Sequence, residues 1–294
     1  MKSLGKGMFS KVYLANVPNT DTFYSLKVVS RKTIEKYAIY EQLLLERQIL
    51  SQLDSPWIMK LVKTYKDQKR IYFLLEFING LDLDVIMRHI GLFTNHDAQF
   101  YTASIILMLQ YLHERDIIYR DLKPENIIID ETGYAKLIDF GTAKILKGRT
   151  YTIVGTPHYM SPEVITGKGY KAFSDLWSLG ICLYEFLCGK VPYADEEDDP
   201  YSIYEAILSE ELAYPDFIDE SNFPAKALIE QLLSKVPETR SPSGFESIKK
   251  HQYFLGFDWE ALRMFDFTPP YTPDVGHPSE ELDLYTHIGR TTLH

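Results

Sequence analysis

Tyr119-Arg120-Asp121-Leu122-Lys123-Pro124-Glu125-Asn126 is the stretch of this chain that says most about its fold, and Asp139-Phe140-Gly141 begins 13 residues after its end. In such a pair of motifs Asp121 can orient an acceptor hydroxyl and take its proton, while Lys123 can offset charge on a transferred phosphoryl group. Asn126 and Asp139 offer hard oxygen ligands of the kind that Mg²⁺ prefers. The pair therefore predicts a phosphoryl-transfer site; the alternative, a chance charged loop between two strands, is disfavoured by the fixed spacing.

Length and composition narrow the class of protein. The chain has 294 residues, a hydrophobic content of 45% and a net charge of −10, so it can form one large domain or two lobes and is not globally disordered. The acidic charge argues against nucleic acid and anionic membranes as partners and suits basic peptides, although a solvated acidic surface is the commoner explanation. Only two cysteines, Cys182 and Cys188, occur, at a helical spacing that predicts no disulfide and a reducing, cytoplasmic location. No run of about 18 apolar residues predicts a membrane span, and the N-terminus resembles neither a signal peptide nor a myristoylation site.

The hydrophobic periodicity changes near Asn79-Gly80, which is the natural hinge. Before it we predict strands at 12–17, 22–29, 58–66 and 70–78 and one helix at 37–53. After it we predict helices at 95–114, 173–188, 201–209, 223–234 and 244–250, and short strands at 127–130 and 134–138. The pattern predicts an α+β fold with a small antiparallel lobe (1–78, first strand truncated), a mainly helical lobe (79–254) and a tail (255–294).

Two features before the hinge are suited to holding phosphates. Gly5-Lys6-Gly7-Met8-Phe9-Ser10-Lys11-Val12 lies between strand-like segments, and glycines let backbone amides approach a phosphate closely, although alone this run would predict a plain hairpin. Lys27 ends a strand-like run and can clamp phosphates if a carboxylate holds it, whereas on its own it would be a surface lysine. Glu46, 19 residues later on the predicted helix, is the favoured partner, with Glu35 and Glu41 as rivals.

The segment 139–163 (the activation segment below) contains a candidate modification site. Thr152 lies 13 residues beyond Asp139. A phosphate there would add about −1.5 to −2 charges, which Arg120 and Lys144 could pair. We therefore predict that Thr152 is an activating phosphorylation site.

Other residues near this segment have predicted positioning roles. Thr156 can hydrogen-bond near Asp121 and contact substrate. Glu163 is expected to form a buried ion pair with Arg240, and Asp175 is expected to hold the backbone of the loop 119–126. The last two roles are structural rather than catalytic.

Taken together, these motifs resemble the eukaryotic protein kinase superfamily over about residues 3–254. Features that look like the AGC group are Tyr119, the run Lys147-Gly148-Arg149-Thr150-Tyr151-Thr152, and Phe257-Asp258-Trp259 with Pro270-Tyr271-Thr272-Pro273. Within that group the runs 155–165 and 183–189 resemble the cyclic-GMP-dependent kinases more than the cyclic-AMP-dependent one. Ser10 and the run 139–144 instead resemble the phosphoinositide-dependent kinase, which stays the alternative.

The resemblance implies a two-lobed kinase fold that uses ATP and Mg²⁺ for serine/threonine phosphorylation. Catalytic roles are implied for Asp121, Lys123, Lys27 and Glu46, and metal ligation for Asn126 and Asp139. Nucleotide contacts are implied for Gly5, Gly7, Ser10, Val12, Lys27, Leu75, Glu76, Ile78, Asp82 and Ile128. Leu75 is expected at the back of the nucleotide pocket, and Ser10 stands where a third glycine is usual.

The resemblance also implies a substrate class and partners. Asp82, Glu125, Glu205 and Thr156 are expected at a peptide groove that selects Arg-x-x or Arg-Arg-x-Ser/Thr sequences; the alternative is that the acids are ordinary surface groups. An upstream activating kinase or a regulatory subunit is an expected partner, since the upstream regulatory domains of such kinases are not in this sequence. The tail lacks a clear Phe-x-x-Phe, and Leu284-Tyr285 is the nearest pair. A pseudokinase would need a lost Lys27, Asp121 or Asp139, and a small-molecule kinase is disfavoured by Thr156-Pro157.

Overall fold

The computed structural model describes residues 2–18, 20–219 and 222–276, and the expected pair Leu284-Tyr285 lies outside them. The first part of the chain forms a five-stranded antiparallel sheet with the order β1-β2-β3-β5-β4. Its strands are β1 (Lys2–Lys6), β2 (Lys11–Asn16), β3 (Phe23–Ser30), β4 (Leu61–Lys66) and β5 (Arg70–Glu76). All four strands that the sequence predicts before the hinge are present, because their side chains alternate at the period of a half-buried sheet.

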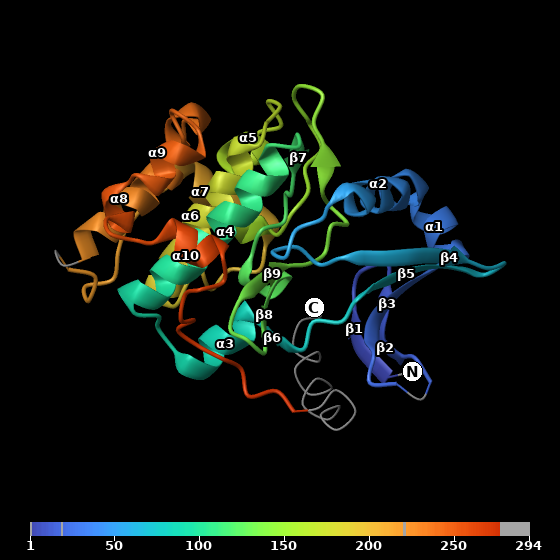
Figure 1. Cartoon of the computed structure of the whole chain (residues 1–294). Coiled ribbons are helices and arrows are strands. Elements are labelled where there is room, and N and C mark those ends of the chain that lie inside the picture. The colour runs from blue at the N-terminus through green and yellow to red at the C-terminus, as the bar shows by residue number, and fades with distance from the viewer. Residues whose placement is uncertain (1, 19, 220–221, 277–294) are drawn as a thin grey trace.

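The helix predicted over 37–53 is wrong in its boundaries. The structure has two helices here, α1 (Arg31–Tyr37) and α2 (Tyr40–Gln52), which lie on one side of the sheet (Figure 1). Ser30 begins α1, because its hydroxyl accepts a hydrogen bond from the backbone N–H of Thr33 at 3.0 Å. Ala38 separates the two helices with φ 53°, a left-handed conformation that ends a helix.

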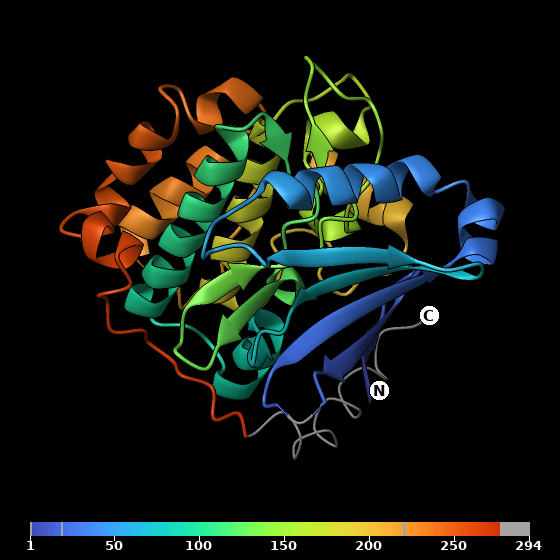
Figure 2. The ribbon, with the colours of Figure 1, turned by 45° about the vertical axis from the view of Figure 1, so that its right-hand side comes forward.

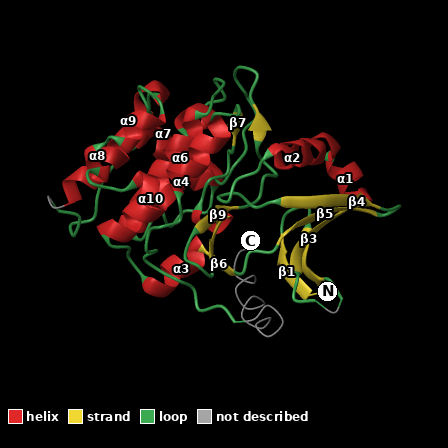
Figure 3. Cartoon of the chain, viewed as in Figure 1, coloured by secondary structure: helices red, strands yellow, loops and turns green. Residues whose placement is uncertain are grey.

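The second part of the chain is mainly helical (Figure 3). Its helices are α3 (Leu83–Ile90), α4 (Asn95–His113), α5 (Pro162–Ile165), α6 (Phe173–Cys188), α7 (Pro200–Ser209), α8 (Phe223–Leu232), α9 (Phe245–Lys249) and α10 (Trp259–Arg263). The helix α6 has its predicted bounds and is buried almost all round, as its apolar composition requires. The helix α4 opens with a capping box between Thr94 and Asp97, as expected from the capping residues at its start. None of the helices in the described ranges is both long and apolar enough to cross a bilayer.

Two small sheets carry the loops at the junction between the two parts. One has the order β6-β8-β9, formed by β6 (Gly80–Asp82), β8 (Ile127–Asp130) and β9 (Ala135–Leu137). The other pairs β7 (Ile117–Ile118) with β10 (Lys144–Ile145). The loop 119–126 is therefore held between β7 and β8, and the turn at Asp139 is held between β9 and β10.

The described part of the tail runs past the hinge. The sequence predicted no structure after residue 255, but α10 forms there because the Asp258 carboxylate accepts the N–H groups of Glu260 and Ala261 at 3.1 and 2.9 Å. From α10 the chain continues in an extended path alongside the small β6-β8-β9 sheet, as Figure 2 shows. The hydroxyl of Tyr134 donates to the carbonyl of Phe267 at 2.6 Å, and the side chain of Asn79 donates to the carbonyl of Gly276 at 3.5 Å.

Candidate active site

A buried carboxylate on α6 holds the backbone of the loop 119–126. Asp175 accepts hydrogen bonds from the backbone N–H groups of Tyr119 and Arg120 at 2.9 and 2.8 Å, and it contacts His113 Nε2 on α4 at 2.7 Å. The scaffold role predicted for Asp175 is confirmed. Arg120 itself has φ 74°, a conformation that persists in a non-glycine residue only where its surroundings fix it.

A compact polar network surrounds the carboxylate of Asp121. Its Oδ1 accepts from the hydroxyl of Thr156 at 2.8 Å and from the backbone N–H of Thr156 at 3.1 Å. Lys123 Nζ donates to the Thr156 hydroxyl at 2.7 Å, and the Asn126 amide donates to Asp121 Oδ2 at 3.1 Å. Lys123, Asn126 and Thr156, three of the residues that the sequence assigned to catalysis, metal and substrate, thus meet around the Asp121 carboxylate, which is suited to orient a hydroxyl.

Across the junction, β3 and α2 bring Lys27 to two carboxylates. Lys27 Nζ lies 2.6 Å from Glu46 Oε1 and 3.3 Å from Asp139 Oδ1. Glu35 and Glu41, the rival partners, are exposed. Burial alone would lower the pKa of Lys27, but Glu46 and Asp139 outweigh it and hold that pKa above its ordinary value. Lys27 remains a cation, as a phosphate clamp must.

Asp139 is positioned as an ionised oxygen ligand. The Lys27 ammonium keeps the pKa of Asp139 below its usual value, against the opposing effect of burial. Asp139 has φ 50°, and its Oδ1 accepts the N–H of Gly141 at 3.1 Å. Within the described ranges no group of three or more His, Cys, Asp or Glu side chains could hold a metal alone. The side-chain oxygens of Asn126 and Asp139 instead fit Mg²⁺, which takes one or two protein oxygens and completes its shell with water and phosphates.

The family model of the protein kinase domain matches residues 1–254. This chain belongs to the protein kinase family. The match confirms the predicted fold class and the predicted enzyme class, an ATP-dependent protein kinase domain.

Individual relatives agree with the predicted resemblance to cyclic-nucleotide-dependent kinases. The cGMP-dependent protein kinase of Eimeria tenella is 45% identical over 276 residues, which is 93% of this chain and 27% of that protein. The same enzyme of Toxoplasma gondii is 44% identical over 293 residues, 96% of this chain and 29% of the relative. The cAMP-dependent protein kinase catalytic subunit PRKX of Homo sapiens is 36% identical over 291 residues, 98% and 80% of the two chains. The kinase chain spans only about a quarter to a third of the cGMP-dependent relatives that it matches.

The residues expected to touch nucleotide line the junction between sheet and helices. Val12 on β2 pairs directly with Lys27 on β3, and Asp82 on β6 pairs with Ile128 on β8. Leu75 is buried near the end of β5, as expected of a residue at the back of a pocket.

The backbone at Gly5 has open space around it, whereas the backbone N–H of Glu76 is already hydrogen-bonded. A Cβ added at Gly5 would meet no atom within 4 Å, while at Gly7 it would lie 3.0 Å from the Ser10 hydroxyl. The N–H of Glu76 donates to the carbonyl of Lys60 at 2.9 Å, and the Glu76 side chain pairs with Lys136. Ile78 is buried beside the hinge. These placements fit the predicted roles, which stay predictions.

The activation segment is anchored at its far end by a buried ion pair. Both guanidinium Nη atoms of Arg240 donate to the Glu163 carboxylate, at 2.6 and 2.9 Å, and Arg240 is fully buried. The predicted pair of Glu163 with Arg240 is therefore confirmed as a two-point contact of the kind that arginine forms with carboxylates.

Two threonines of the activation segment, Thr150 and Thr152, differ in their exposure. The residue Thr152 is exposed, whereas Thr150 is buried and its hydroxyl accepts from Lys144 Nζ at 3.0 Å. Arg120 Nε donates to the carbonyl of Thr142 at 2.6 Å, and among the described residues its Nη2 forms no hydrogen bond. In the unmodified kinase Lys144 thus holds Thr150, so pairing of Lys144 with a phosphate on Thr152 would require that contact to break.

Three carboxylates lie near the catalytic loop (119–126): Asp82, Glu125 and Glu185 (the acidic cluster). Burial raises the pKa of Asp82 to about 6 and the pKa of Glu185 to about 7, and the charge of Glu125 contributes to both shifts. The charges acting most on Glu185 come from Glu125, Asp84 and Asp195. Glu205, which the sequence assigned to the peptide groove, is exposed on α7, and its role stays a prediction.

Sequence reasoning missed Glu185 because it lies inside a helix that otherwise predicts pure core. It is the one charged residue between Leu176 and Cys188. The Tyr159 hydroxyl donates to Glu185 Oε2 at 2.6 Å, so the carboxylate is tied to the activation segment. A lone carboxylate in a buried apolar helix is costly unless it has a partner or a function, and that is the signal that could have found it.

Proposed function

We propose that this kinase transfers the γ-phosphoryl group of ATP to serine or threonine in proteins that carry arginines two or three residues before the acceptor. The observation that supports this proposal is the acidic cluster: the charge of Glu125, a residue of the catalytic loop beside Asp121, contributes to the raised pKa of both Asp82 and Glu185. A carboxylate takes a guanidinium in a two-point contact that adds orientation to attraction. Glu205, exposed on α7, stays the predicted contact for one of these arginines, and Glu185 is a further candidate.

The chemistry follows from the residues around Asp121. The Asp121 carboxylate orients the acceptor hydroxyl and takes its proton, and the Thr156 hydroxyl keeps that carboxylate in place. Lys123, 3.8 Å from Asp121, offsets charge on the phosphoryl group. Lys27, fixed by Glu46, clamps the nucleotide phosphates.

Two side chains are the proposed metal ligands. Asn126 and Asp139 would hold Mg²⁺, which neutralises phosphate charge when bound. The Lys27 ammonium keeps Asp139 ionised for that task, since it lowers the pKa of that carboxyl group.

The same proposal covers activation of the enzyme, the roles of its lobes and tail, and its location. Phosphorylation of Thr152 by an upstream kinase activates the enzyme, with Arg120 as the first partner of the phosphate. Residues 1–78, 79–254 and 255–294 act as small lobe, large lobe and tail. The relatives are named as cGMP- or cAMP-dependent kinases, so we propose control by a cyclic-nucleotide-binding regulatory partner or domain and a cytoplasmic location.

A positional peptide array with [γ-³²P]ATP and Mg²⁺ tests the substrate class. We expect selection of arginine two and three residues before the acceptor. Glu205→Gln and Glu185→Gln should each reduce selection for one of these arginines about tenfold, whereas Glu211→Gln, an exposed glutamate shortly after α7, should leave the profile as in the parent. An array indifferent to upstream arginine, or one that favours acidic or proline-directed sites, would refute the proposed specificity.

A further inference from the structure

Tyr170 lies in the loop between α5 and α6 and holds the activation segment with both its backbone and its ring. Its N–H donates to the carbonyl of Thr150 at 2.8 Å, and the Thr150 N–H donates back to the carbonyl of Tyr170 at 3.0 Å. The ring is only 2% exposed, because it packs against Ile118, Met160 and Val164. Packing around the ring therefore helps to set the position of this side chain.

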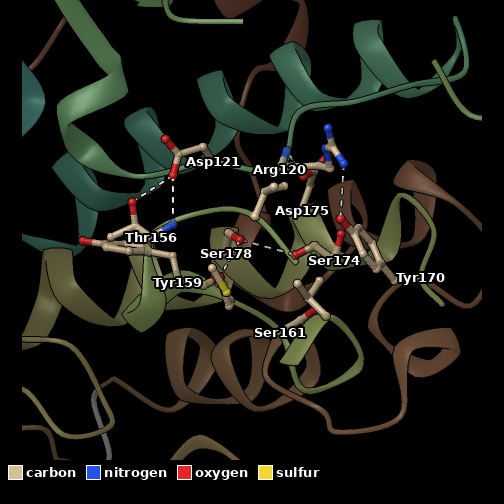
Figure 4. A pocket seen from close by; sticks show the side chains of 12 residues that line it. Arg120, Asp121, Thr156, Tyr159, Ser161, Tyr170, Ser174, Asp175 and Ser178 are labelled. Atoms are coloured by element: carbon tan, nitrogen blue, oxygen red, sulfur yellow. Dashed lines mark hydrogen bonds between the residues drawn. The ribbon is translucent and has the colours of Figure 1, made fainter. Parts of the chain in front are cut away.

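The Tyr170 hydroxyl contacts two functional segments, and Figure 4 shows its bond to Arg120. It donates to the backbone carbonyl of Thr152 at 2.6 Å, and it accepts from Arg120 Nη1 at 3.4 Å. The same guanidinium donates through Nε to the carbonyl of Thr142, at the start of the activation segment. One buried hydroxyl thus joins the predicted phosphorylation site to the residue directly before Asp121.

Arg120 is a position at which a small displacement matters. Its φ of 74° is maintained by its contacts, and its N–H is fixed by Asp175 at 2.8 Å. The activation segment passes directly over it, since a Cβ added at Gly155 would lie 2.7 Å from the Arg120 carbonyl oxygen. A shift of residues 152–155 would therefore press on the backbone of Arg120 and Asp121.

We propose that Tyr170 is a positioning residue for phosphoryl transfer: its hydroxyl ties the Thr152 carbonyl to the Arg120 guanidinium and so keeps the activation segment in register with the loop 119–126. The catalytic part of this inference rests on the proposed function, whereas the structural tie does not. The proposal leaves the substrate class as proposed above and assigns Tyr170 no bond to nucleotide or acceptor.

Tyr170→Phe removes the hydroxyl and keeps the packed ring. We expect kcat for an arginine-containing peptide to fall about fivefold, which corresponds to the loss of one hydrogen bond, with the KM for ATP unchanged. Tyr184→Phe is the matched control, because Tyr184 is also 2% exposed and its hydroxyl donates to a backbone carbonyl, that of Ala213 at 2.8 Å. That variant should keep the parent kcat. p-Aminophenylalanine at position 170 keeps a donor and should restore kcat to within about twofold.

Hydrogen exchange tests the tie without any activity. In Tyr170→Phe the amides of residues 150–155 should exchange at least about threefold faster, while Tyr184→Phe leaves them as in the parent. If Tyr170→Phe does not fold, p-fluorophenylalanine, which fills the space of the hydroxyl but cannot donate, replaces it in both measurements.

The two measurements separate the possible failures. Unchanged exchange and unchanged kcat in Tyr170→Phe would overturn the proposal, as would an equal loss of kcat in Tyr184→Phe. A parent that phosphorylates no peptide would refute the proposed function, while faster exchange at 150–155 in Tyr170→Phe would still establish the tie.

Discussion

At the scale of single side chains, Lys27 and Asp121 should dominate turnover. Lys27→Met removes the ammonium that lies 2.6 Å from Glu46, and Asp121→Asn removes the carboxylate that we propose takes the acceptor proton. Each change should lower kcat on the order of 10²–10⁴-fold, because each group acts in the transition state. Steady-state phosphorylation of an arginine-containing peptide measures the loss.

The controls for these two variants are stability and an unrelated carboxylate. Both proteins should melt as cooperatively as the parent. Asp54→Asn changes an almost fully exposed acid, 93% accessible, and should leave kcat unchanged. A folded Asp121→Asn enzyme that works at the parent rate would remove Asp121 from the proposed mechanism.

The acidic cluster should make substrate recognition dependent on pH. The pKa of Glu185 is raised to about 7 and that of Asp82 to about 6, so both become neutral as pH falls through these values. A neutral carboxyl attracts guanidinium less, and the KM for an Arg-Arg-x-Ser peptide should therefore rise about fivefold or more between pH 7.5 and 5.5. Initial rates across this range measure the effect.

A peptide that carries alanines in place of the arginines is the internal control for this pH dependence. Its KM should change much less with pH, and Glu185→Gln should flatten the profile of the arginine peptide. Identical pH profiles for the two peptides would mean that the acidic cluster does not bind the arginines.

At the scale of elements, the activation segment should be regulated at one of its two neighbouring threonines. Mass spectrometry of active enzyme should find phosphate on the exposed Thr152 and none on Thr150, whose hydroxyl is buried against Lys144. Thr152→Val should lower kcat at least about tenfold, because the new charge-assisted bonds that order the segment are lost. Full activity of Thr152→Val would exclude this site as the activator.

The pair of Glu163 with Arg240 should contribute to stability rather than to chemistry. Glu163→Gln leaves a fully buried guanidinium without its anion, so the free energy of unfolding should fall by about 3–5 kcal/mol. Urea unfolding measures this loss. Glu260→Gln breaks an exposed pair with Arg263 and should barely move the midpoint. Equal midpoints for the two variants would contradict the anchoring role.

At the scale of the whole molecule, the tail should stabilise the junction between sheet and helices. Phe267 stacks on Phe257 at 5.2 Å, and the carbonyls of Phe267 and Gly276 accept hydrogen bonds from Tyr134 and Asn79. Truncation after Asp266 should therefore lower the melting temperature by a few degrees and weaken ATP binding about threefold, because it removes contacts beside the hinge. Thermal melting and calorimetric ATP titration measure the two effects.

Truncation after Gly276 is the matched control, because it keeps all the described tail contacts. It should bind ATP as the full chain does. If both truncations behave alike, the segment 267–276 contributes nothing to the hinge.

Much of this molecule follows from local sequence. The catalytic loop and the turn at Asp139 are short runs whose chemistry depends on neighbours in the chain, and helices such as α4 and α6 are set by periodicity and capping. Even the distant pairs of Lys27 with Glu46 and Glu163 with Arg240 could be predicted. Spacing along the chain favoured Glu46 over Glu35 and Glu41, and each pair supplies the opposite charge that a buried ion needs.

Only the tertiary structure decided the choices between similar residues. Glu185 could not be picked out from the sequence of an apolar helix, but the charge of Glu125 acts on its pKa, because α6 packs beside the loop 119–126. Thr150 and Thr152 differ in exposure although they are two residues apart, and the left-handed Ala38 splits a stretch that the periodicity predicted as one helix. Periodicity and residue type report the conformation of a segment, whereas burial and the approach of charges depend on how segments pack against each other.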